Sequence, residues 1–537
     1  MKDVKEIFKL TFFQLAVVYS ILVVAVSTEL LWKYSLQFNL FALVLAVFGT
    51  FALNDKSKKE TEMKWIFVLF SIGLMFALFL RSVPYFNNSV PLGYDPGIYK
   101  YIFESFERSL PNIPGAGMDA WVIGNFPPGL ATLMDLFYVS GFNTHQLLTT
   151  VFVLLSSLLI FPIYLVSKRY FNKETGLLAV LLYAFSYTQL QTFWYMYYKN
   201  VVAMGLMLFS IYFMDMKEKR FSMLMIPFAT AVGFVHRPTF LILLMVWIGY
   251  VIVNFKNKKI VRKNVTEILA TGFLLLIIYL PILNEIILKP LEGVFGSVVA
   301  PGTIGSGTFY SFFTYQFVSL SYLPFALLGF FFSIIRKKWN PLFLWFLING
   351  FIVFFRIMFY NRFIIQLDVV LILMAGAGIY YGIINSIKSN KISVGIVILL
   401  LAASGFTAYD FASTANPLLN NTQLVSIEKI SNLTEEDAFV MATTSYYSPW
   451  VLGYSGRKTI APGLFDHNKW NRRQWSVFWS SGNMGEIKDL LNMYEKPLYI
   501  FIGKHPSNNI INPQKFEDNC FEQVLNDVGG ILYKYLC

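Results

Sequence analysis

The residue best placed to do chemistry is a single carboxylate, Asp95, in the segment GYDPGIYKYIFESFERSL (93–110). A carboxylate within hydrogen-bond reach of a hydroxyl group can accept its proton and so act as a general base. The same segment favours a helix start, with Asp95 as the N-cap and Pro96 at the first helical position. The two interpretations are compatible, because a capping carboxylate at the apex of a loop remains available to a substrate. Tyr94 and Glu104 are secondary candidates beside it.

The helix predicted after Asp95 is amphipathic. One face carries Ile98, Ile102, Phe106 and Leu110, and another carries Lys100, Glu104 and Arg108. Residues spaced by four positions lie on one side of a helix, so the apolar and polar faces are separated. We expect such a helix to lie in a membrane interface.

A second set of candidates consists of basic side chains next to apolar segments: Lys199 in YMYYKN, His236 and Arg237 in GFVHRP, and Arg356 and Arg362 in FFRIMFYNRF. A basic side chain within a membrane needs a compensating partner, and the fork of an arginine fits a phosphate group. A lipid-linked phosphate is therefore one predicted ligand, with Arg356 and Arg362, which flank one turn, as the strongest candidates. The alternative is that these side chains extend their charges to water or pair with Asp135, Glu285 or Asp368.

The elements that must position these residues are membrane helices. The chain has 537 residues, of which 56% are hydrophobic, 18% aromatic and 14% charged, and its mean hydropathy is +0.56. Soluble domains carry about 25% charged residues, so this composition predicts a polytopic α-helical membrane protein. Apolar runs near the roughly 17 to 25 residues that cross a bilayer recur about thirteen times. They lie near 10–30, 36–53, 65–82, 144–167, 175–191, 198–216, 221–236, 238–255, 267–283, 310–335, 341–356, 363–385 and 392–410.

The orientation follows from the basic loops, since Lys and Arg gather on the cytoplasmic side of a membrane. Segments such as NDKSKKETEMK (54–64), KEKR (217–220) and KNKKIVRKN (256–264) all fall on one side when the spans are counted in order. This predicts a cytoplasmic N-terminus, with the loop 83–143 and everything after residue 410 outside. The same loops account for most of the net charge of +12, which is therefore no sign of nucleic-acid binding.

The chain after the last span has the composition of a small water-soluble domain. Strand-length apolar segments lie at 437–443, 497–503 and 531–536, and helical patterns lie at 422–433 and 484–494. We therefore predict a membrane domain of residues 1–410 and an extracytoplasmic α/β domain of residues 411–537. Cys520 and Cys537 both lie in this external part, where a disulfide is chemically permitted, and their spacing is not a metal-binding motif.

Two aromatic clusters lie on the predicted external side, QTFWYMYY (191–198) and RRQWSVFW (472–479). Aromatic rings can stack on the faces of sugars. The alternative for the first cluster is an aromatic belt at the membrane interface. The alternative for the second is packing of the C-terminal domain onto the membrane domain.

This organisation resembles the GT-C superfamily of integral-membrane glycosyltransferases, which includes protein O-mannosyltransferases, aminoarabinose transferases and the catalytic subunit of oligosaccharyltransferase. The similarity lies in many spans, an acidic residue in the first large external loop, an amphipathic helix after it and a soluble C-terminal domain. Locally it lies in GYDPGIYKYIFES (93–105), NFPPGLATLMDLF (125–137), YYKNVVAMGLMLFSIYF (197–213) and NRFIIQLDVVLILMAGAGI (361–379).

The resemblance implies a sugar donor carried on a polyprenyl (for example dolichyl) phosphate in the outer leaflet. It implies that Asp95 is the general base that activates an acceptor hydroxyl. The implied phosphate-binding residues are Arg356 and Arg362, then Lys199 and Arg237, with His236 as a secondary candidate. No cofactor is required, because fixed cations can stabilise a departing phosphate, and a divalent metal is permitted.

The sequence departs in two places from the motifs of particular families within this superfamily. The WWDYG motif of oligosaccharyltransferases is missing, since SPWVLGYSGRKTIAPG (448–463) shares only a Trp and a Gly-Tyr pair with it. This argues against transfer of an oligosaccharide to asparagine. Asp95 is also followed by proline and not by the second acid of protein O-mannosyltransferases, so a second carboxylate would have to come from Glu104, Asp119 or Asp135.

The expected function is transfer of a sugar from a polyprenyl-phosphate donor to an acceptor outside the cytoplasm. The expected partners are that donor, a protein or glycan acceptor and the lipids of the cell membrane. The alternative is a transporter or flippase of lipid-linked sugars. Transporters commonly have internal repeats and helices broken at the bilayer midplane. In this chain the polar residues gather instead at the external edge, which favours the transferase.

Overall fold

The computed structural model describes residues 58–109, 118–216, 218–280, 309, 312–319, 322–335, 340–357, 360–385, 390–504 and 511–537. The chain divides into two compact units. Unit 1 comprises Met1–Pro84, Ser140–Phe142 and Thr150–Ala415, and unit 2 comprises Tyr85–Val139, Asn143–Thr149 and Asn416–Cys537. Most of the 83–143 segment thus belongs to the same unit as the C-terminal residues.

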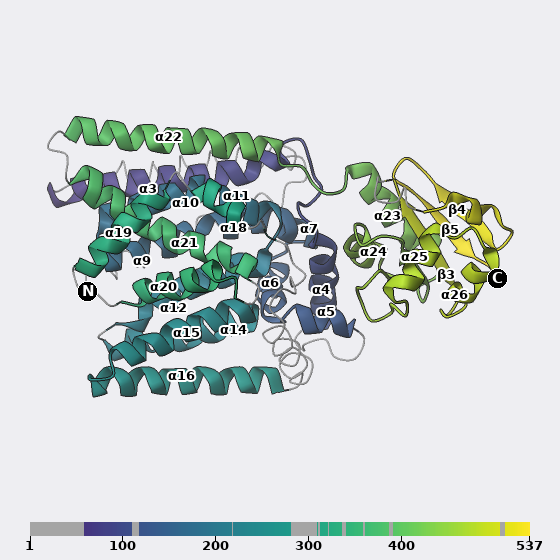
Figure 1. Ribbon diagram of the computed structural model, residues 1–537, viewed down its shortest axis with the longest axis horizontal. Helices are drawn as coiled ribbons and strands as arrows, with labels where there is room; N and C mark the ends of the chain where they lie inside the picture. The colour runs from purple at the N-terminus through teal and green to yellow at the C-terminus, as the bar shows by residue number, and fades with distance from the viewer. Residues whose placement is uncertain are drawn as a thin grey trace. The chain divides into compact units, whose positions relative to one another are not determined.

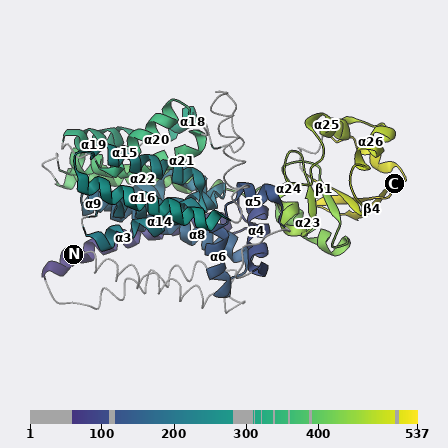
Figure 2. The same ribbon diagram turned by 90° about the horizontal axis from the view of Figure 1, so that it is seen from below.

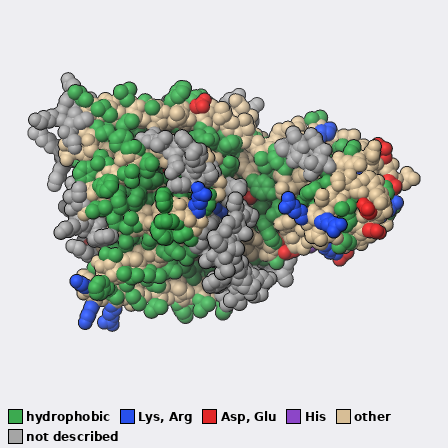
Figure 3. Space-filling view, viewed as in Figure 1, with side chains coloured by type: hydrophobic (Ala, Val, Ile, Leu, Met, Phe, Trp, Pro, Cys, Tyr) green, Lys and Arg blue, Asp and Glu red, His purple; other side chains and the backbone are tan. Residues whose placement is uncertain are grey.

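Unit 1 is a bundle of helices that run side by side in both ribbon views (Figures 1 and 2). Its helices are α3 (Lys58–Ser82), α8 (Phe152–Leu158), α9 (Ile160–Tyr170), α10 (Lys173–Phe185), α11 (Tyr187–Trp194), α12 (Tyr198–Met214), α13 (Lys219–Ser222), α14 (Met225–Val235), α15 (Arg237–Val253), α16 (Lys258–Tyr279), α18 (Phe312–Ser319), α19 (Leu323–Ile335), α20 (Pro341–Phe354), α21 (Tyr360–Ile379) and α22 (Asn390–Thr414). In the space-filling view, hydrophobic side chains cover much of the visible face of this bundle (Figure 3).

Four helical stretches in the described residues are long and apolar enough to cross a membrane. They are Trp65–Tyr85, Thr144–Tyr170, Tyr360–Ile384 and Ile392–Thr414. Shorter apolar helices cover the predicted spans at 198–216, 221–236, 238–255 and 341–356. The predictions at 10–30 and 36–53 lie outside the described residues. A polytopic helical membrane protein is therefore confirmed, whereas the count of thirteen spans stays a prediction.

One predicted span, 175–191, is broken in the structure at Ser186. This residue ends α10 and caps α11, where its hydroxyl accepts a hydrogen bond from the Gln189 N–H at 3.2 Å. The same hydroxyl donates to Asp368 of α21 at 2.8 Å. Serine competes with the helical backbone for hydrogen bonds, so this pair of contacts stabilises the break.

Unit 2 combines helices of the 83–143 segment with a small α/β region. Its elements are α4 (Pro96–Ser109), α5 (Ala120–Asn125), α6 (Gly129–Val139), α7 (Thr144–Gln146), α23 (Asn421–Leu433), β1 (Phe439–Ala442), α24 (Ser448–Ser455), β2 (Lys458–Ile460), α25 (Arg472–Ser480), α26 (Met484–Leu491), β3 (Leu498–Gly503), β4 (Phe521–Asn526) and β5 (Gly530–Tyr535). The sheet order is β2-β1-β3-β5-β4, with β2, β1 and β3 parallel and β5 and β4 antiparallel. The C-terminal α/β fold predicted from the sequence is thus present.

The aromatic cluster at 472–479 forms α25, and its largest side chains are buried within unit 2. Trp475 is 2% exposed and Phe478 is fully buried, and both pack with Trp470 in the core of the sheet. Neither sugar stacking nor packing onto the membrane domain accounts for these two residues. Both predictions are wrong for them, because burying such large rings within the domain removes more apolar surface from water than an exposed position allows.

The two cysteines form a disulfide, Cys520–Cys537, which ties the C-terminal residue to the start of β4. We expect its removal, by serine at both positions, to destabilise unit 2 by about 3 kcal/mol through loss of loop-closure entropy. Thermal unfolding of the full protein, with and without a reductant, measures this loss. Detection of free thiols in the unreduced wild type would contradict the presence of this disulfide.

Helices α4 and α24 cross closely at two glycines of unit 2. A Cβ atom added to Gly97 would lie 1.9 Å from the Pro449 carbonyl oxygen, and one added to Gly453 would lie 2.0 Å from the Gly97 carbonyl oxygen. No side chain fits at this crossing, so the backbone of the helix that follows Asp95 rests directly on α24.

We expect Gly97→Ala to lower the thermal unfolding midpoint, since such overpacking costs typically about 1–3 kcal/mol. A matched control is Gly395→Ala in α22, where an added Cβ meets no atom within 4 Å. Alanine should be neutral or stabilising there, because it is the better helix former. Equal midpoints for the two variants would rule out the close crossing.

Candidate functional site

Asp95 lies at the start of α4, with its side chain half-buried. The Asp95 carbonyl oxygen accepts the first helical hydrogen bond, from the Tyr99 N–H at 3.0 Å, and Pro96 is the first helical residue, as predicted. The neighbouring Tyr94 hydroxyl donates to the Ser445 carbonyl oxygen at 2.6 Å. Burial, and then the negative charge of Asp95, raise the pKa of Tyr94. The loop that carries Asp95 is therefore anchored to the segment after β1.

The amphipathic helix α4 buries its apolar face within unit 2, with Ile98, Ile102 and Phe106 at most 5% exposed. On its other face Glu104 forms ion pairs with Lys100 and, at 3.8 Å, with Arg108. The predicted apolar and polar faces of this helix are correct for the described residues, which do not include Leu110. Glu104 also accepts a hydrogen bond from the Thr144 hydroxyl at 3.2 Å, so this carboxylate is engaged in local structure.

The second possible carboxylate, Asp119, takes part in a reciprocal contact with Asp466. Asp119 caps α5 by accepting from the Val122 N–H at 3.1 Å, and it also accepts from the Asp466 N–H at 2.9 Å. Asp466 in turn accepts from the N–H groups of Ala120 and, at 3.1 Å, Trp121. Burial raises the pKa of Asp119, and the charge of Asp466 adds to this. This pair joins the segment before α5 to the 461–471 loop within unit 2.

Four of the five predicted basic residues lie together in unit 1. His236, which is 4% exposed, interacts electrostatically with Lys199, Arg237 and Arg362. We call Lys199, His236, Arg237 and Arg362 the basic cluster. They come from three separate parts of the sequence, and the three cations are all half-buried.

The basic cluster lies at the N-terminal ends of three helices. Lys199 is the second residue of α12, Arg237 is the first of α15 and Arg362 is the third of α21. The N-terminus of a helix carries partial positive charge, so a cation there is unfavourable and an anion is favourable. Three cations and three helix ends thus concentrate positive charge, which favours the binding of a negatively charged group. A phosphate has the charge and the acceptor oxygens to bind there.

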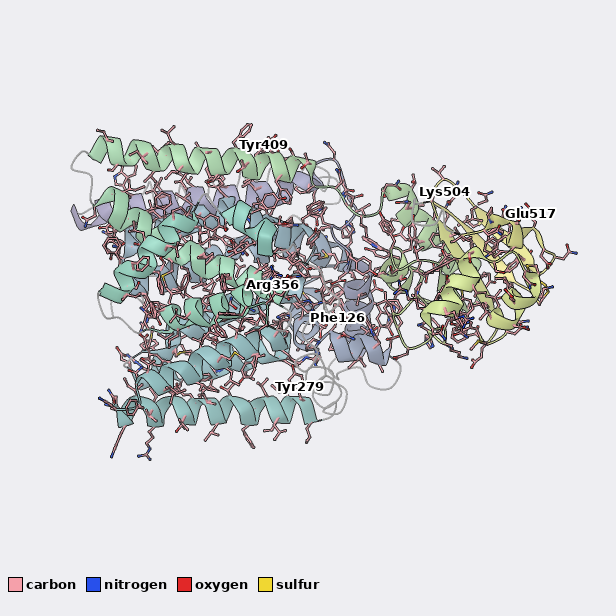
Figure 4. All side chains as sticks on the ribbon, viewed as in Figure 1. Phe126, Tyr279, Arg356, Tyr409, Lys504 and Glu517 are labelled. Atoms are coloured by element: carbon pink, nitrogen blue, oxygen red, sulfur yellow. A yellow bond between two sulfur atoms is a disulfide. The ribbon has the colours of Figure 1, made fainter. Side chains whose placement is uncertain are left out.

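Arg356 differs from the other predicted cations. It follows α20 (labelled in Figure 4) with a left-handed backbone (φ 55°), a conformation that few non-glycine residues adopt. Its side chain is exposed. Among the described residues no interaction joins Arg356 to the basic cluster. The structure therefore separates Arg356 from Arg362, although the two flank one turn in the sequence.

The alternative that Asp368 pairs with these cations finds no support in the hydrogen bonds of Asp368. Asp368 is fully buried in α21 and accepts hydrogen bonds from four neutral groups: Ser186 Oγ at 2.8 Å, Gln189 Nε2 at 2.9 Å, Tyr315 OH at 3.3 Å and the Tyr322 hydroxyl. These donors satisfy the carboxylate without a basic partner. Glu285 lies outside the described residues, and Asp135 belongs to unit 2.

One buried cation, Arg81, was missed by the sequence reasoning. Arg81 lies at the end of α3 and is fully buried, with its guanidinium 4.9 Å from the centre of the Tyr183 ring. Its Nη1 donates to the Ala77 carbonyl oxygen at 3.2 Å, while Nε and Nη2 have no hydrogen-bond partner in the described part of the chain. Arg81 follows the apolar run LFL in the sequence. A basic residue next to an apolar segment is the same pattern that identified the other cations.

A metal site is not evident in the described ranges, where no three His, Cys, Asp or Glu side chains are grouped as ligands. The carboxylates Glu104 and Asp119 are engaged by ion pairs and backbone N–H groups.

Comparison with known proteins gives one family match. Residues 125–284, which run from α5 to beyond α16, match the family of dolichyl-phosphate-mannose-protein mannosyltransferases. No curated protein sequence matches the chain.

Several solved structures share the fold. The archaeal oligosaccharyltransferase AglB from Archaeoglobus fulgidus, in complex with an inhibitory peptide and a dolichol-phosphate, has a TM-score of 0.60 and 15% identity, covering 82% of this chain and 70% of that one. ArnT from Cupriavidus metallidurans, bound to undecaprenyl phosphate, has a TM-score of 0.58 and 10% identity, covering 88% and 98%. The arabinofuranosyltransferase AftD from Mycobacteria has a TM-score of 0.51 and 12% identity, covering 88% and 41%.

The family match and the shared fold agree. The chain thus shares its fold with solved integral-membrane glycosyltransferases, in agreement with the resemblance to the GT-C superfamily predicted from the sequence.

Proposed function

We propose that the protein transfers a sugar from a polyprenyl-phosphate donor to a hydroxyl group of an acceptor outside the cytoplasm. The observation that carries this proposal is the basic cluster, in which three cations and a histidine meet at three helix N-termini. Such a cluster supplies the charge and the hydrogen-bond donors that the phosphate of a lipid-linked sugar requires. The lipid phosphates bound to AglB and ArnT support this class of donor.

The proposed reaction needs a base and a stabilised leaving group. The acceptor oxygen attacks the anomeric carbon of the sugar while Asp95 takes its proton. The bond between that carbon and the phosphate oxygen breaks, and the polyprenyl phosphate leaves with the bonding electrons. Arg362, Lys199 and Arg237 stabilise the negative charge that develops on this phosphate. Arg356 stays a candidate for the same group, at a position outside the basic cluster.

We propose that unit 2 faces the outside of the cell membrane and that the N-terminus is cytoplasmic. The disulfide in unit 2 supports this orientation, since disulfides persist in oxidising compartments. The external part would then comprise the C-terminal domain of residues 411–537 together with Tyr85–Val139 and Asn143–Thr149 of unit 2.

The proposed phosphate site predicts selective loss of lipid binding. Purified Lys199→Gln/Arg237→Gln should bind labelled undecaprenyl phosphate at least about tenfold more weakly than the wild type, because two charge-assisted contacts are lost. The matched control is Lys258→Gln/Arg262→Gln, two exposed cations of α16, which should bind as the wild type does. Equal weakening by both double variants would indicate a general effect of charge and would refute the site.

A further inference from the structure

His236 is held by a chain of two hydrogen bonds that the proposed reaction does not itself require. Its Nδ1 lies 2.7 Å from the Thr239 Oγ1, and the Gln366 Nε2 donates to the same Oγ1 at 3.1 Å. Thr239 is 1% exposed and Gln366 is 3% exposed. Thr239 belongs to the first turn of α15, and Gln366 lies one turn after Arg362 on α21. The three side chains thus connect the starts of two helices within unit 1.

The direction of these hydrogen bonds determines where the imidazole carries its proton. A hydroxyl group has one proton to donate. The Thr239 oxygen accepts from Gln366, and His236 Nδ1 is the one acceptor that the described residues offer for the hydroxyl proton of Thr239, so this proton is directed at Nδ1. Nδ1 then acts as the acceptor, and the ring proton lies on Nε2.

The opposite nitrogen of His236 has no such partner. Within the residues that the structure describes, the one hydrogen bond of the His236 ring is that of Nδ1. The charges of Lys199, Arg237 and Arg362 act on the same ring. An N–H group in this surrounding is suited to an anionic acceptor, since every charged neighbour attracts the same anion.

We propose that Thr239 and Gln366 are positioning residues that fix His236 as the Nε2–H tautomer, so that it donates one hydrogen bond to the donor phosphate. This inference rests on the proposed function, because it names a further contact to the same phosphate. Thr239 and Gln366 act only through His236. The two links are separable: the tautomer belongs to the protein without ligand, and the hydrogen bond to phosphate belongs to the complex.

The tautomer can be read directly by ¹⁵N NMR of histidine-labelled protein, since the chain has only four histidines. The signal of His236 is assigned by its loss in His236→Gln. We expect an unprotonated Nδ1 and a protonated Nε2 in the wild type and in Thr239→Ser, and a mixture of tautomers in Thr239→Val. A protonated Nδ1 in the wild type, or an unchanged tautomer in Thr239→Val, would overturn the proposal.

Binding of labelled undecaprenyl phosphate tests the second link. Thr239→Val should weaken binding about tenfold, Thr239→Ser should restore it, and Gln366→Leu should resemble Thr239→Val. The matched control is Thr230→Val in α14, a buried threonine whose hydroxyl has no partner in the described residues, and it should bind normally.

Three results of the binding experiment have different meanings. Weaker binding by Thr239→Val that accompanies the tautomer change supports the proposal. Unchanged binding despite the tautomer change refutes the contact between His236 and phosphate. A wild type that binds no polyprenyl phosphate refutes the proposed function as well, while the NMR result still decides whether Thr239 fixes the tautomer.

Discussion

Asp95→Asn is expected to lower sugar transfer by about 10²- to 10⁴-fold, the usual contribution of a general base. Asparagine has nearly the same shape and is as good a helix N-cap as aspartate, so α4 should still begin at Pro96. The variant therefore removes the proton acceptor and retains the helix start. Transfer from labelled polyprenyl-phosphate sugars, in membranes with equal amounts of each protein, measures the effect.

A binding measurement and a control variant separate loss of the base from loss of the donor. Binding of polyprenyl phosphate should be retained in Asp95→Asn, since the basic cluster belongs to unit 1 and is unchanged. The matched control is Glu107→Gln, an exposed carboxylate on the same helix, which should transfer at the wild-type rate. If Asp95→Asn is as active as Glu107→Gln, Asp95 serves only as a helix cap.

Arg362→Gln is expected to have the second large effect, a loss of roughly 10²- to 10³-fold in kcat, as when one preorganised donor to a developing negative charge is removed. Arg362 lies at the N-terminus of α21 and interacts electrostatically with His236. A phosphate bound there would be attracted by the arginine and by the helix end. Arg362→Lys keeps the charge and loses the forked geometry, so an intermediate loss is expected.

Two other arginine variants serve as controls for Arg362→Gln. Arg262→Gln, on the exposed start of α16, should have no effect on kcat. Arg356→Gln should have a smaller effect than Arg362→Gln, because Arg356 is exposed and lies outside the basic cluster. Equal losses for Arg362→Gln and Arg262→Gln would remove Arg362 from the proposed phosphate site.

The sequence predicted the candidate residues better than their arrangement. Long apolar runs and basic loops have a direct physical meaning in a membrane, so the helices at 65–82, 363–385 and 392–410 were predictable. The break at Ser186 was not, because it depends on a hydrogen bond to Asp368, which is remote in the sequence.

The basic cluster illustrates the same limit. A cation beside an external loop is visible in the sequence, and this signal found four members of the cluster. The sequence could not separate Arg362 from Arg356, since a turn of this length allows many directions for each side chain. Thr239 and Gln366 carried no signal at all, because a neutral polar residue in an apolar helix acquires its role only from the residue that it contacts.

Aromatic residues were the least predictable. The pattern RRQWSVFW is compatible with an exposed surface, an interface or a core, and the structure buries Trp475 and Phe478 in the core of the sheet. Periodicity identifies a helix but not the partner of its apolar face. Likewise, the sequence divided the chain at residue 410, whereas the loop that carries Asp95 belongs to unit 2.

The central claim is that the protein moves a sugar from a polyprenyl-phosphate donor to an external acceptor. The most direct test uses purified protein in sealed vesicles that carry a polyprenyl-phosphate sugar labelled in the sugar, with a membrane extract as the acceptor. We predict that the label becomes covalently attached to the acceptor and that free polyprenyl phosphate appears in equal amount. Label that stays on the lipid and only crosses the bilayer would contradict the account and identify a transporter of lipid-linked sugars.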